Sequence, residues 1–338
     1  MPNPNVEAHA LPPGCASLSE PKLAAHLFDG TYKIGIGVYD GLSALLAEKG
    51  KFDFAWVSSF CCSAALGIPD AGIVGPEEIL NVIRCVRRSI RLPIVVDLDS
   101  GYGDAVKVFH VVEAMARAGA AALCIEDNPV SKRCSLYDRD ERLLASPAEH
   151  VMRLRAARAA IDNLGMDCRI IARTEALVAG MGLPEALQRA EAYAHAGADA
   201  VFVQSLDSSG DEVLEFGRAW KARTPLFIAP TRLPHITRTQ FKAVGVSHHI
   251  FANQGIRAAH KAMADTFAAL SEAECSLEAE RSISSVKDVA ASVGAEKVFA
   301  METQFAKNGG TSHHRGRRTL SKASNSRSKA TRIPAHRR

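Results

Sequence analysis

The sequence lacks the segments that place a chain in or across a membrane. No apolar run approaches the ~18 residues that span a bilayer. The first residues carry no basic segment followed by an apolar core. We therefore expect neither a transmembrane helix nor a secretory signal, and a cytoplasmic location.

The cysteines lack the spacing of a metal site or a disulfide framework. There are eight of them, but no CxxC pair and no histidine spacing suited to zinc. Several lie in apolar runs, where a reduced thiol behaves as a small hydrophobic residue. The pattern predicts free thiols in a reducing compartment.

Acidic residues are missing from the end of the chain. From Lys307 to Arg338 there are ten lysines and arginines and no acid. Without this tail the chain has 31 basic and 37 acidic residues, a net charge of −6. A basic tail of low complexity is typical of a disordered, solvated arm, with weak attachment to nucleic acid or other anions as the alternative. The acidic body does not indicate a nucleic-acid-binding protein.

Strand-like and helix-like segments alternate through the rest of the chain. Four prolines within residues 1–20 predict an irregular N-terminal arm, and a short helix follows from Pro21. Short apolar runs predict strands at Ile34–Val38, Phe54–Ser58, Ile94–Leu98, Ala121–Glu126, Arg169–Thr174, Asp199–Gln204, Leu226–Ala229 and His249–Ala252. Helical patterns follow at Leu42–Lys49, Pro76–Ile90, Ala105–Gly119, Pro147–Leu164, Pro184–Ala196, Glu212–Ala222, Arg238–Val244 and Gly255–Leu270.

Eight strand–helix units predict an α/β protein with parallel strands. Eight is the number that closes a (β/α)8 TIM-type barrel, which we expect over residues 21–270. An open, doubly wound sheet is the alternative, but no strand is followed by GxGxxG. A helical segment over residues 271–306 follows, and the basic tail occupies residues 307–338.

Polar residues gather at the predicted carboxyl ends of the strands, where barrel enzymes have their active sites. They are Tyr39, Asp40, Trp56, Ser58, Ser59, Asp97, Asp99, Glu126, Asp127, Arg173, Glu175, Gln204, Ser205, Thr231 and Asn253. Asp97 and Asp99 lie on the same side of an extended chain, because successive side chains alternate. Such hard oxygen ligands suit Mg²⁺. A pair of loop-capping carboxylates without a metal is the alternative.

The order and spacing of several motifs resembles the phosphoenolpyruvate mutase / isocitrate lyase superfamily. The resemblance covers roughly residues 25–270. The matching segments are Tyr39–Ala44, Trp56–Ser58, Asp97–Gly103, Ile125–Asp127, Ile171–Ala176, Gly180–Gly182, Ala196–Ala200, Pro230–Thr231 and Ala252–Asn253. The segments Ser135–Asp138, Leu143–Ala145 and Gly245–Ser247 are similar to the phosphoenolpyruvate mutase branch.

The resemblance implies a barrel that is commonly tetrameric, with its last helix exchanged between pairs of subunits. It implies a Mg²⁺ site, completed in part by water, formed by Asp97, Asp99, Glu126 and Asp70. The implied substrate-binding residues are Trp56, the Ser58 hydroxyl, the backbone amides of Ser59 and Phe60, Arg173 and Gln204. Residues 127–138 would form a mobile loop that closes over the site.

That loop departs from the mutase pattern, which is Glu-Asp-Lys, then five intervening residues, then Asn-Ser. Asn128 replaces the lysine and Cys134 the asparagine, while Ser59 and Gln204 replace a usual glycine and histidine. Lys132-Arg133-Cys134 instead resembles the lyase motif Lys-Lys/Arg-Cys-Gly-His, although Ser135-Leu136 stands in place of Gly-His. Lys132 or Arg133 could replace the missing lysine, and we expect these cations to lower the pKa of Cys134.

The reaction we expect first is the interconversion of phosphoenolpyruvate and 3-phosphonopyruvate, an isomerase reaction of phosphonate biosynthesis. Its expected catalytic residues are Cys134, Arg173, Asp70 and Ser135, with Lys132, Arg133 and Asn128 near the substrate. One alternative is a carbon–carbon lyase or hydrolase of a 2-alkylmalate-, isocitrate- or oxaloacetate-like substrate that uses Cys134 as acid or base. Others are a phosphonopyruvate hydrolase and an inactive member that binds oxo acids. The expected partners are a small oxo acid and further copies of the chain, not a membrane or nucleic acid.

Overall fold

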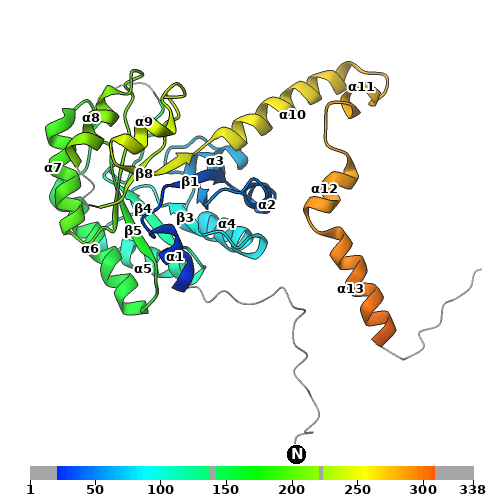
Figure 1. Cartoon of the computed structure of the whole chain (residues 1–338), viewed down its shortest axis with the longest axis horizontal. Helices are drawn as coiled ribbons and strands as arrows, with labels where there is room; N and C mark the ends of the chain where they lie inside the picture. The colour runs from blue at the N-terminus through cyan, green and yellow to red at the C-terminus, as the bar shows by residue number, and fades with distance from the viewer. Residues whose placement is uncertain (1–20, 138–141, 221–223, 309–338) are drawn as a thin grey trace, which may run out of the picture. The chain divides into compact units, whose positions relative to one another are not determined.

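The protein is a closed barrel of eight parallel strands surrounded by helices (Figure 1). The structure is a computed structural model that describes residues 21–137, 142–220 and 224–308. The strands are β1 (Lys33–Val38), β2 (Phe54–Val57), β3 (Ile94–Asp97), β4 (Ala122–Glu126), β5 (Arg169–Thr174), β6 (Ala200–Val203), β7 (Leu226–Ile228) and β8 (Val246–Phe251). Each strand pairs with the next and β8 pairs with β1, which confirms the predicted (β/α)8 fold.

Helices cover the barrel and continue beyond it. Those of the barrel are α1 (Pro21–Leu27), α2 (Gly41–Lys49), α3 (Ser59–Ala65), α4 (Pro76–Ser89), α5 (Ala105–Arg117), α6 (Pro147–Leu164), α7 (Gly182–His195), α8 (Asp211–Trp220) and α9 (Arg238–Ala243). They are followed by α10 (Gln254–Glu272), α11 (Leu277–Glu280), α12 (Val286–Ser292) and α13 (Ala295–Asn308).

Local sequence signals set the ends of the helices, as α6 illustrates. Ser146 caps α6 by accepting a hydrogen bond from the Glu149 amide at 3.2 Å. Pro147 takes the first helical position, where its missing N–H costs no hydrogen bond. Gly165 follows the last turn with φ +62°, a conformation that glycine adopts without strain. The helix therefore begins and ends at the predicted residues.

Aromatic side chains fill the inside of the barrel. The rings of Trp56 and Phe202 lie 5.8 Å apart, and those of Phe54 and Phe227 lie 6.2 Å apart. A Cβ atom at Gly35 would come within 2.3 Å of the Phe54 ring, so β1 has room only for glycine there. The interior is thus a packed core rather than a pore.

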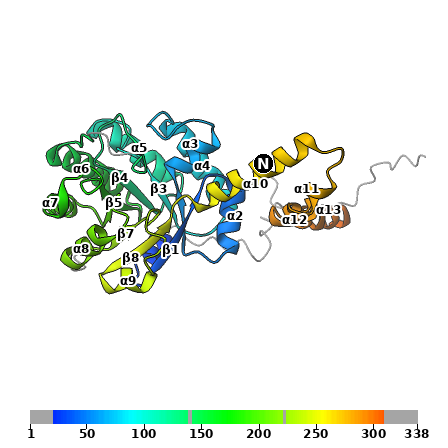
Figure 2. The same ribbon diagram turned by 90° about the horizontal axis from the view of Figure 1, so that it is seen from above.

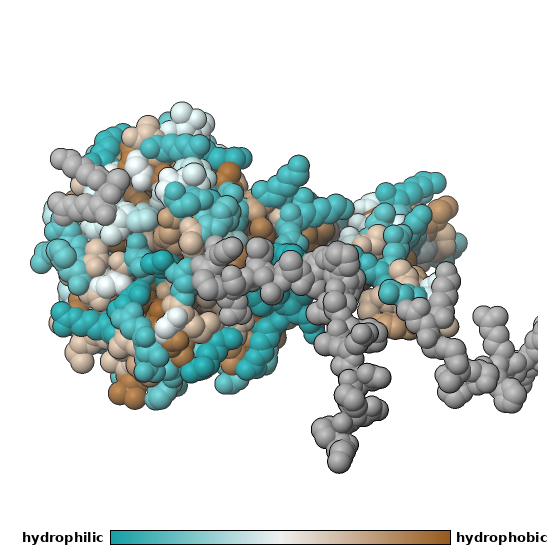
Figure 3. Space-filling model, turned by 60° about the horizontal axis from the view of Figure 1, so that its bottom comes forward, coloured by the Kyte–Doolittle hydropathy of each residue, from teal (hydrophilic) through white to brown (hydrophobic). Residues whose placement is uncertain are grey.

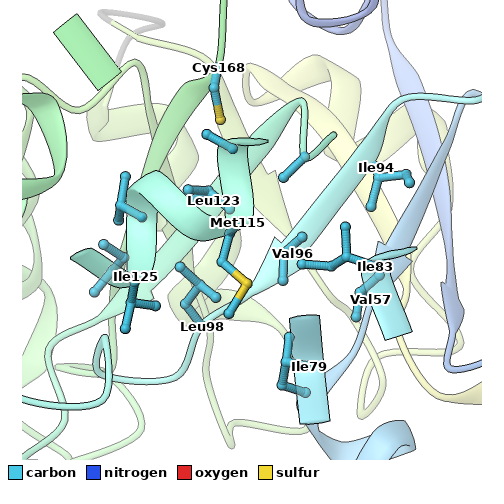
Figure 4. Close-up of a cluster of buried hydrophobic side chains, with 14 of the residues drawn as sticks. Val57, Ile79, Ile83, Ile94, Val96, Leu98, Met115, Leu123, Ile125 and Cys168 are labelled. Carbon is cyan, nitrogen blue, oxygen red and sulfur yellow. The ribbon is translucent and has the colours of Figure 1, made fainter. Parts of the chain in front are cut away.

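A second apolar layer joins the strands to the helices outside them. In Figure 4, Met115 of α5 lies beside Val96 and Leu123, and Ile83 of α4 lies beside Val57. All five side chains are buried, and burial of each such side chain contributes roughly 1.5–3 kcal/mol. The two layers fix the strands, and hence the positions of the polar residues at the strand ends.

Two elements differ from the sequence-based prediction. Helix α3 was not predicted; it begins directly after β2, and Ser58 caps it by accepting from the Cys61 amide at 3.3 Å. Strand β8 begins at Val246, three residues earlier than predicted. His248 and His249 therefore lie within the strand, where both side chains are buried.

The predicted helix over residues 255–270 is α10, and the predicted helical segment over residues 271–306 contains three separate helices, α11 to α13. Helix α10 leads away from the barrel in both ribbon views (Figures 1 and 2). The described residues up to Val293 form one compact unit, and those from Gly294 form a second. The predicted arm over residues 1–20 and almost all of the predicted tail lie outside the described residues. The domain limits and the exchange of the last barrel helix stay predictions.

One face of the barrel surface is drawn in Figure 3. On the face drawn in Figure 3, hydrophilic residues cover most of the barrel and hydrophobic ones are scattered between them. Within the described ranges, no helix has the length and apolar content needed to span a bilayer.

His248 is packed in the barrel core as a neutral side chain. Its ring stacks on Phe227 with centroids 3.8 Å apart, and its Nε2 lies 2.9 Å from the Leu27 carbonyl oxygen. Burial lowers the pKa of His248 from 6.5 to about 4. In the unfolded chain His248 takes up a proton as the pH falls through 6.5, while the folded form stays neutral. Its stabilising contribution is therefore lost on acidification between these two pH values.

This titration predicts a pH-dependent effect of His248→Phe. The unfolding free energy decreases by at most ~1.4 kcal/mol per pH unit through His248. The variant lacks this decrease, because phenylalanine does not titrate. We expect the unfolding free energy of the wild type, minus that of the variant, to decrease from about pH 6.5 to pH 5. Urea unfolding at several pH values measures this difference. The same change at exposed His260 is the control, and a pH-independent difference for His248→Phe would contradict the prediction.

Candidate active site

Most of the predicted site residues line one cavity at the carboxyl end of the barrel, whereas the predicted metal ligands Asp99 and Glu126 do not line it. Its volume is about 40 Å³, which holds only a few water molecules. The lining residues are Trp56, Ser58, Ser59, Phe60, Asp70, Asp97, Lys132, Cys134, Ser135, Leu136, Arg173, Phe202, Gln204, Ala229, Thr231, Ala252 and Asn253. Pockets for small ligands measure ~300–1,000 Å³, so this cavity must widen before a ligand of that size enters.

Two of the predicted substrate-binding residues lie outside this cavity. Arg133 lines a separate hollow together with Ser131 and Arg142. Asn128 donates a hydrogen bond to Glu126 Oε1 at 2.8 Å and is buried. Of the two cations considered as replacements for the missing lysine, only Lys132 therefore faces the cavity.

Buried carboxylates are concentrated at the ends of β3 and β4. Asp97, Asp99 and Asp70 are at most 6% exposed, and Glu126 is fully buried. Asp99 has φ +50°, and its amide donates to Asp97 Oδ1 at 3.3 Å. The Glu126 amide donates to the Asp99 carbonyl oxygen at 2.8 Å. Burial raises the pKa of Glu126 to about 8 and the pKa of Asp99 above its usual value. Carboxylates that are ionised in this region lie where water is excluded, which requires nearby cations.

Lys132 supplies one of these cations. Its Nζ donates to Ser59 Oγ at 2.7 Å, to Asp70 Oδ1 at 3.0 Å and to Asp99 Oδ1. Ser59 in turn donates to Asp97 Oδ2 at 3.1 Å. Burial alone would lower the pKa of Lys132, but the surrounding carboxylates outweigh it and raise the pKa well above its usual value. Lys132 therefore stays charged inside the cluster.

Arg173 is the second cation of the site. Its Nε donates to Glu175 Oε1 at 2.6 Å and lies 3.4 Å from Glu126 Oε2, while its Nη2 donates to Ser135 Oγ at 2.5 Å. The guanidinium also lies over the Phe202 ring, 4.8 Å from its centroid. Arg173 thus makes an ion pair with Glu175 and at the same time connects β5 to the loop that covers the cavity.

The expectation of an activated thiol at Cys134 is wrong. Burial raises the pKa of Cys134 to about 12, and the charge of Asp70 adds to this shift. The neighbouring cations do not offset it, because Lys132 is bonded to carboxylates and Arg133 lies in the outer hollow. Cys134 is a protonated thiol in the wall of the cavity.

The predicted metal ligands are close together but do not form a ready ligand set. Within the part of the chain that the structure describes, no three His, Cys, Asp or Glu side chains converge as metal ligands. Instead, Lys132 lies between Asp70 and Asp99. The chemistry of the donors nevertheless fits Mg²⁺, since they are carboxylates and Glu126 Oε2 is buried without a hydrogen-bond partner. Displacement of Lys132 would free Asp70 and Asp99 for an ion.

Sequence reasoning missed part of the cavity wall. Thr231 and Asn253 were placed at strand ends without a role; they line the cavity, and Asn253 Nδ2 donates to Thr231 Oγ1 at 3.2 Å. The apolar residues Leu136 and Phe202 also line it. The only sequence signal for a role in the cavity was the position of these residues at a strand end or in a loop. For the apolar residues this signal fails, because apolar residues at such positions cannot be told from core residues by sequence.

Comparison with known proteins agrees with this geometry. Residues 29–271 match the family described as phosphoenolpyruvate phosphomutase. The chain belongs to this family. A solved phosphoenolpyruvate phosphomutase from Streptomyces platensis subsp. rosaceus is 36% identical, with a TM-score of 0.80 over 84% of this chain and 99% of that one.

The family includes proteins with different reactions. A phosphonopyruvate hydrolase from Variovorax sp. (strain Pal2) is 34% identical, over 84% of this chain and 98% of its own. The solved complex of a phosphonopyruvate hydrolase with oxalate and Mg²⁺ is 33% identical, with a TM-score of 0.77 over 85% of this chain and 99% of that one. The 2-methylisocitrate lyase of Aeropyrum pernix is 36% identical, over 67% of this chain and 71% of its own. Mutase, hydrolase and lyase reactions all occur among these relatives.

The ion pairs of Arg173 predict a large loss of stability in Arg173→Met. The change leaves Glu126 and Glu175 buried without their cation, which costs ~3–5 kcal/mol. Arg169→Met is a matched control at the other end of β5, where Arg169 is more exposed and pairs with Asp167 at 2.9 Å. Loss of such a surface pair costs at most ~1 kcal/mol. Urea unfolding of both variants checks the prediction, which equal losses would contradict.

Proposed function

We propose that this protein is a Mg²⁺-dependent enzyme that interconverts phosphoenolpyruvate and 3-phosphonopyruvate. The observation that supports it most is that Lys132 and Arg173 face the same small cavity as Asp97 and Asp70. A phosphoryl group in transfer needs cations around it and little water. The carboxylates can hold a metal ion for the oxo-acid end of the substrate, and the two cations can hold the phosphoryl end.

The oxo-acid end has suitable partners at the start of α3. Ser59 and Phe60 begin this helix and line the cavity. The N–H groups in the first turn of a helix have no acceptor within the helix. We propose that the amides of Ser59 and Phe60, with the Ser58 hydroxyl, donate to the substrate carboxylate.

The carboxylates hold the metal in this proposal. Asp97, Asp99 and Glu126 would bind Mg²⁺, with Asp70 acting in part through water. When bound, the ion stabilises negative charge on the enolate oxygen. Lys132 must first leave Asp70 and Asp99, and its ammonium is then available for the phosphoryl group. It would so replace the lysine whose position Asn128 occupies.

Arg173 and the covering loop complete the site. The planar guanidinium of Arg173 matches the geometry of a phosphoryl group, and its contact with Ser135 moves with the loop. When the loop formed by residues 127–138 closes over the cavity, little room is left for water beside the reacting group. This exclusion of water is what separates transfer to carbon from hydrolysis.

The reaction is tested by ³¹P NMR of 3-phosphonopyruvate incubated with the enzyme and Mg²⁺. We expect the phosphonate signal to be replaced by that of phosphoenolpyruvate. Inorganic phosphate and pyruvate would indicate the hydrolase instead. An unchanged phosphonate signal, with Mg²⁺-dependent binding of oxalate intact, would contradict both phosphonate reactions. Loss of oxalate binding as well would indicate a protein without a functional metal site.

A carbon–carbon lyase is the second candidate, because Cys134 lines the cavity as a protonated thiol. A thiol with a raised pKa holds the proton that an enolate carbon would accept. The substrate would be a 2-alkylmalate-, isocitrate- or oxaloacetate-like acid. Cys134→Ser separates the two candidates: the mutase should keep a substantial part of its activity, whereas a lyase should lose nearly all of it.

We also propose that the protein is a tetramer in which α10 packs against a second copy. Large apolar side chains on α10 are exposed, among them Met263, Phe267 and Leu270. Light scattering on the full chain should give four times the mass of one chain. The double variant Phe267→Glu/Met263→Glu should shift it to smaller species, and a wild-type mass equal to one chain would contradict the proposal.

A further inference from the structure

We propose that Arg189 is a positioning residue that ties together the two ends of the loop carrying Lys132, Cys134 and Ser135. This role goes beyond the proposed reaction, because any substrate that enters the cavity requires this loop to open and to close again in register. Arg189 touches neither the cavity nor the reacting atoms; it lies on α7, behind the strand ends.

The two ends of the loop meet at one point. Asp127 follows directly after β4, and Ala145 directly precedes the residue that caps α6. The Ala145 amide donates to the Asp127 carbonyl oxygen at 2.9 Å. The loop is therefore joined to the barrel at this pair of residues.

The guanidinium of Arg189 forms hydrogen bonds with both ends of the loop. Arg189 Nη1 donates to Asp127 Oδ2 at 3.1 Å and to the Ala145 carbonyl oxygen at 2.9 Å. Its Nε is bonded to Glu185 Oε1 at 2.8 Å, one helical turn earlier on α7. Arg189 is only 4% exposed, so these hydrogen bonds do not compete with bulk water and are strong.

Asp127 connects the loop ends to the end of β5 through hydrogen bonds of its carboxylate. Its carboxylate is fully buried and accepts from Thr174 Oγ1 at 2.9 Å, from the Glu175 amide at 2.8 Å and from Tyr193 Oη at 2.8 Å. Thr174 and Glu175 directly follow Arg173, which binds the loop residue Ser135. The loop ends, the end of β5 and α7 thus form one hydrogen-bonded unit.

The unit fixes where the loop can pivot. With both ends tied, the segment that carries Lys132 moves as a flap on a rigid base and returns its side chain to the same carboxylates. Without Arg189, the buried Asp127 carboxylate loses its cation and the Ala145 carbonyl loses its donor. The base should then open locally, at a lower free energy than the rest of the barrel.

Local opening is measurable by trypsin, because Lys132, Arg133 and Arg142 lie within the loop. In Arg189→Met we expect cleavage at these sites to be roughly ten- to hundredfold faster than in the wild type, as for loss of hydrogen bonds to a charged group. Cleavage at sites elsewhere in the barrel should change much less. Arg189→Lys keeps the charge and should restore part of the protection. Mass spectrometry of early fragments identifies the sites.

Arg158→Met is the matched control. Arg158 is on α6 and bonds Asp199 Oδ2 at 2.5 Å and the Gly197 carbonyl oxygen at 3.3 Å, and none of its hydrogen bonds reaches the described part of the loop. It should leave cleavage of the loop unchanged. Unchanged loop cleavage in a folded Arg189→Met variant, or an equal rise at all sites, would overturn the proposal.

If Arg189→Met does not fold, Tyr193→Phe tests the same unit more gently. It removes only the hydroxyl that bonds Asp127 and Arg189 Nη1. Loop cleavage should then be several-fold faster, and an unchanged rate would overturn the proposal. None of these measurements needs a substrate, so they fail or succeed independently of the proposed reaction.

Discussion

The charge balance between Lys132 and the buried carboxylates is the interaction on which the site depends. Four acidic side chains lie where the ends of β3 and β4 meet the loops, and water has almost no access to them. Lys132 pairs with Asp70 and Asp99, and Arg173 pairs with Glu126. Because removal of a cation from buried carboxylates is costly, Lys132 can leave only when another cation takes its place. In the proposed function, movement of the covering loop and binding of the metal ion would therefore be coupled.

The barrel supplies the rigid part of this arrangement. Side chains packed inside and outside the strands hold the strand ends, so that residues far apart in the chain share one cavity. The loop is the part that we propose to be mobile. It brings Lys132, Cys134 and Ser135 to the cavity, and its ends are tied to β5 and α7 through Asp127. Substrate entry and exclusion of water require both parts.

Much of this fold could be predicted from sequence, because each strand is a short apolar run and each helix has clear end signals, as at Ser146 and Gly165. Helix α3 escaped because it has 7 residues and follows β2 without a loop. The site was predictable as a set of strand-end residues but not in its contacts. Lys132 and Asp70 are 62 residues apart, and no local pattern reveals their ion pair. The pKa of Cys134 was mispredicted for the same reason: its sequence neighbours point elsewhere.

The most direct measurement is the position of Mn²⁺, used in place of Mg²⁺ for its anomalous X-ray signal, in crystals that also contain oxalate. We predict one ion bound by Asp97, Asp99 and Glu126, with Lys132 Nζ moved away from Asp99. An ion bound elsewhere, or Lys132 still bonded to Asp70 and Asp99 at saturating Mn²⁺, would contradict it.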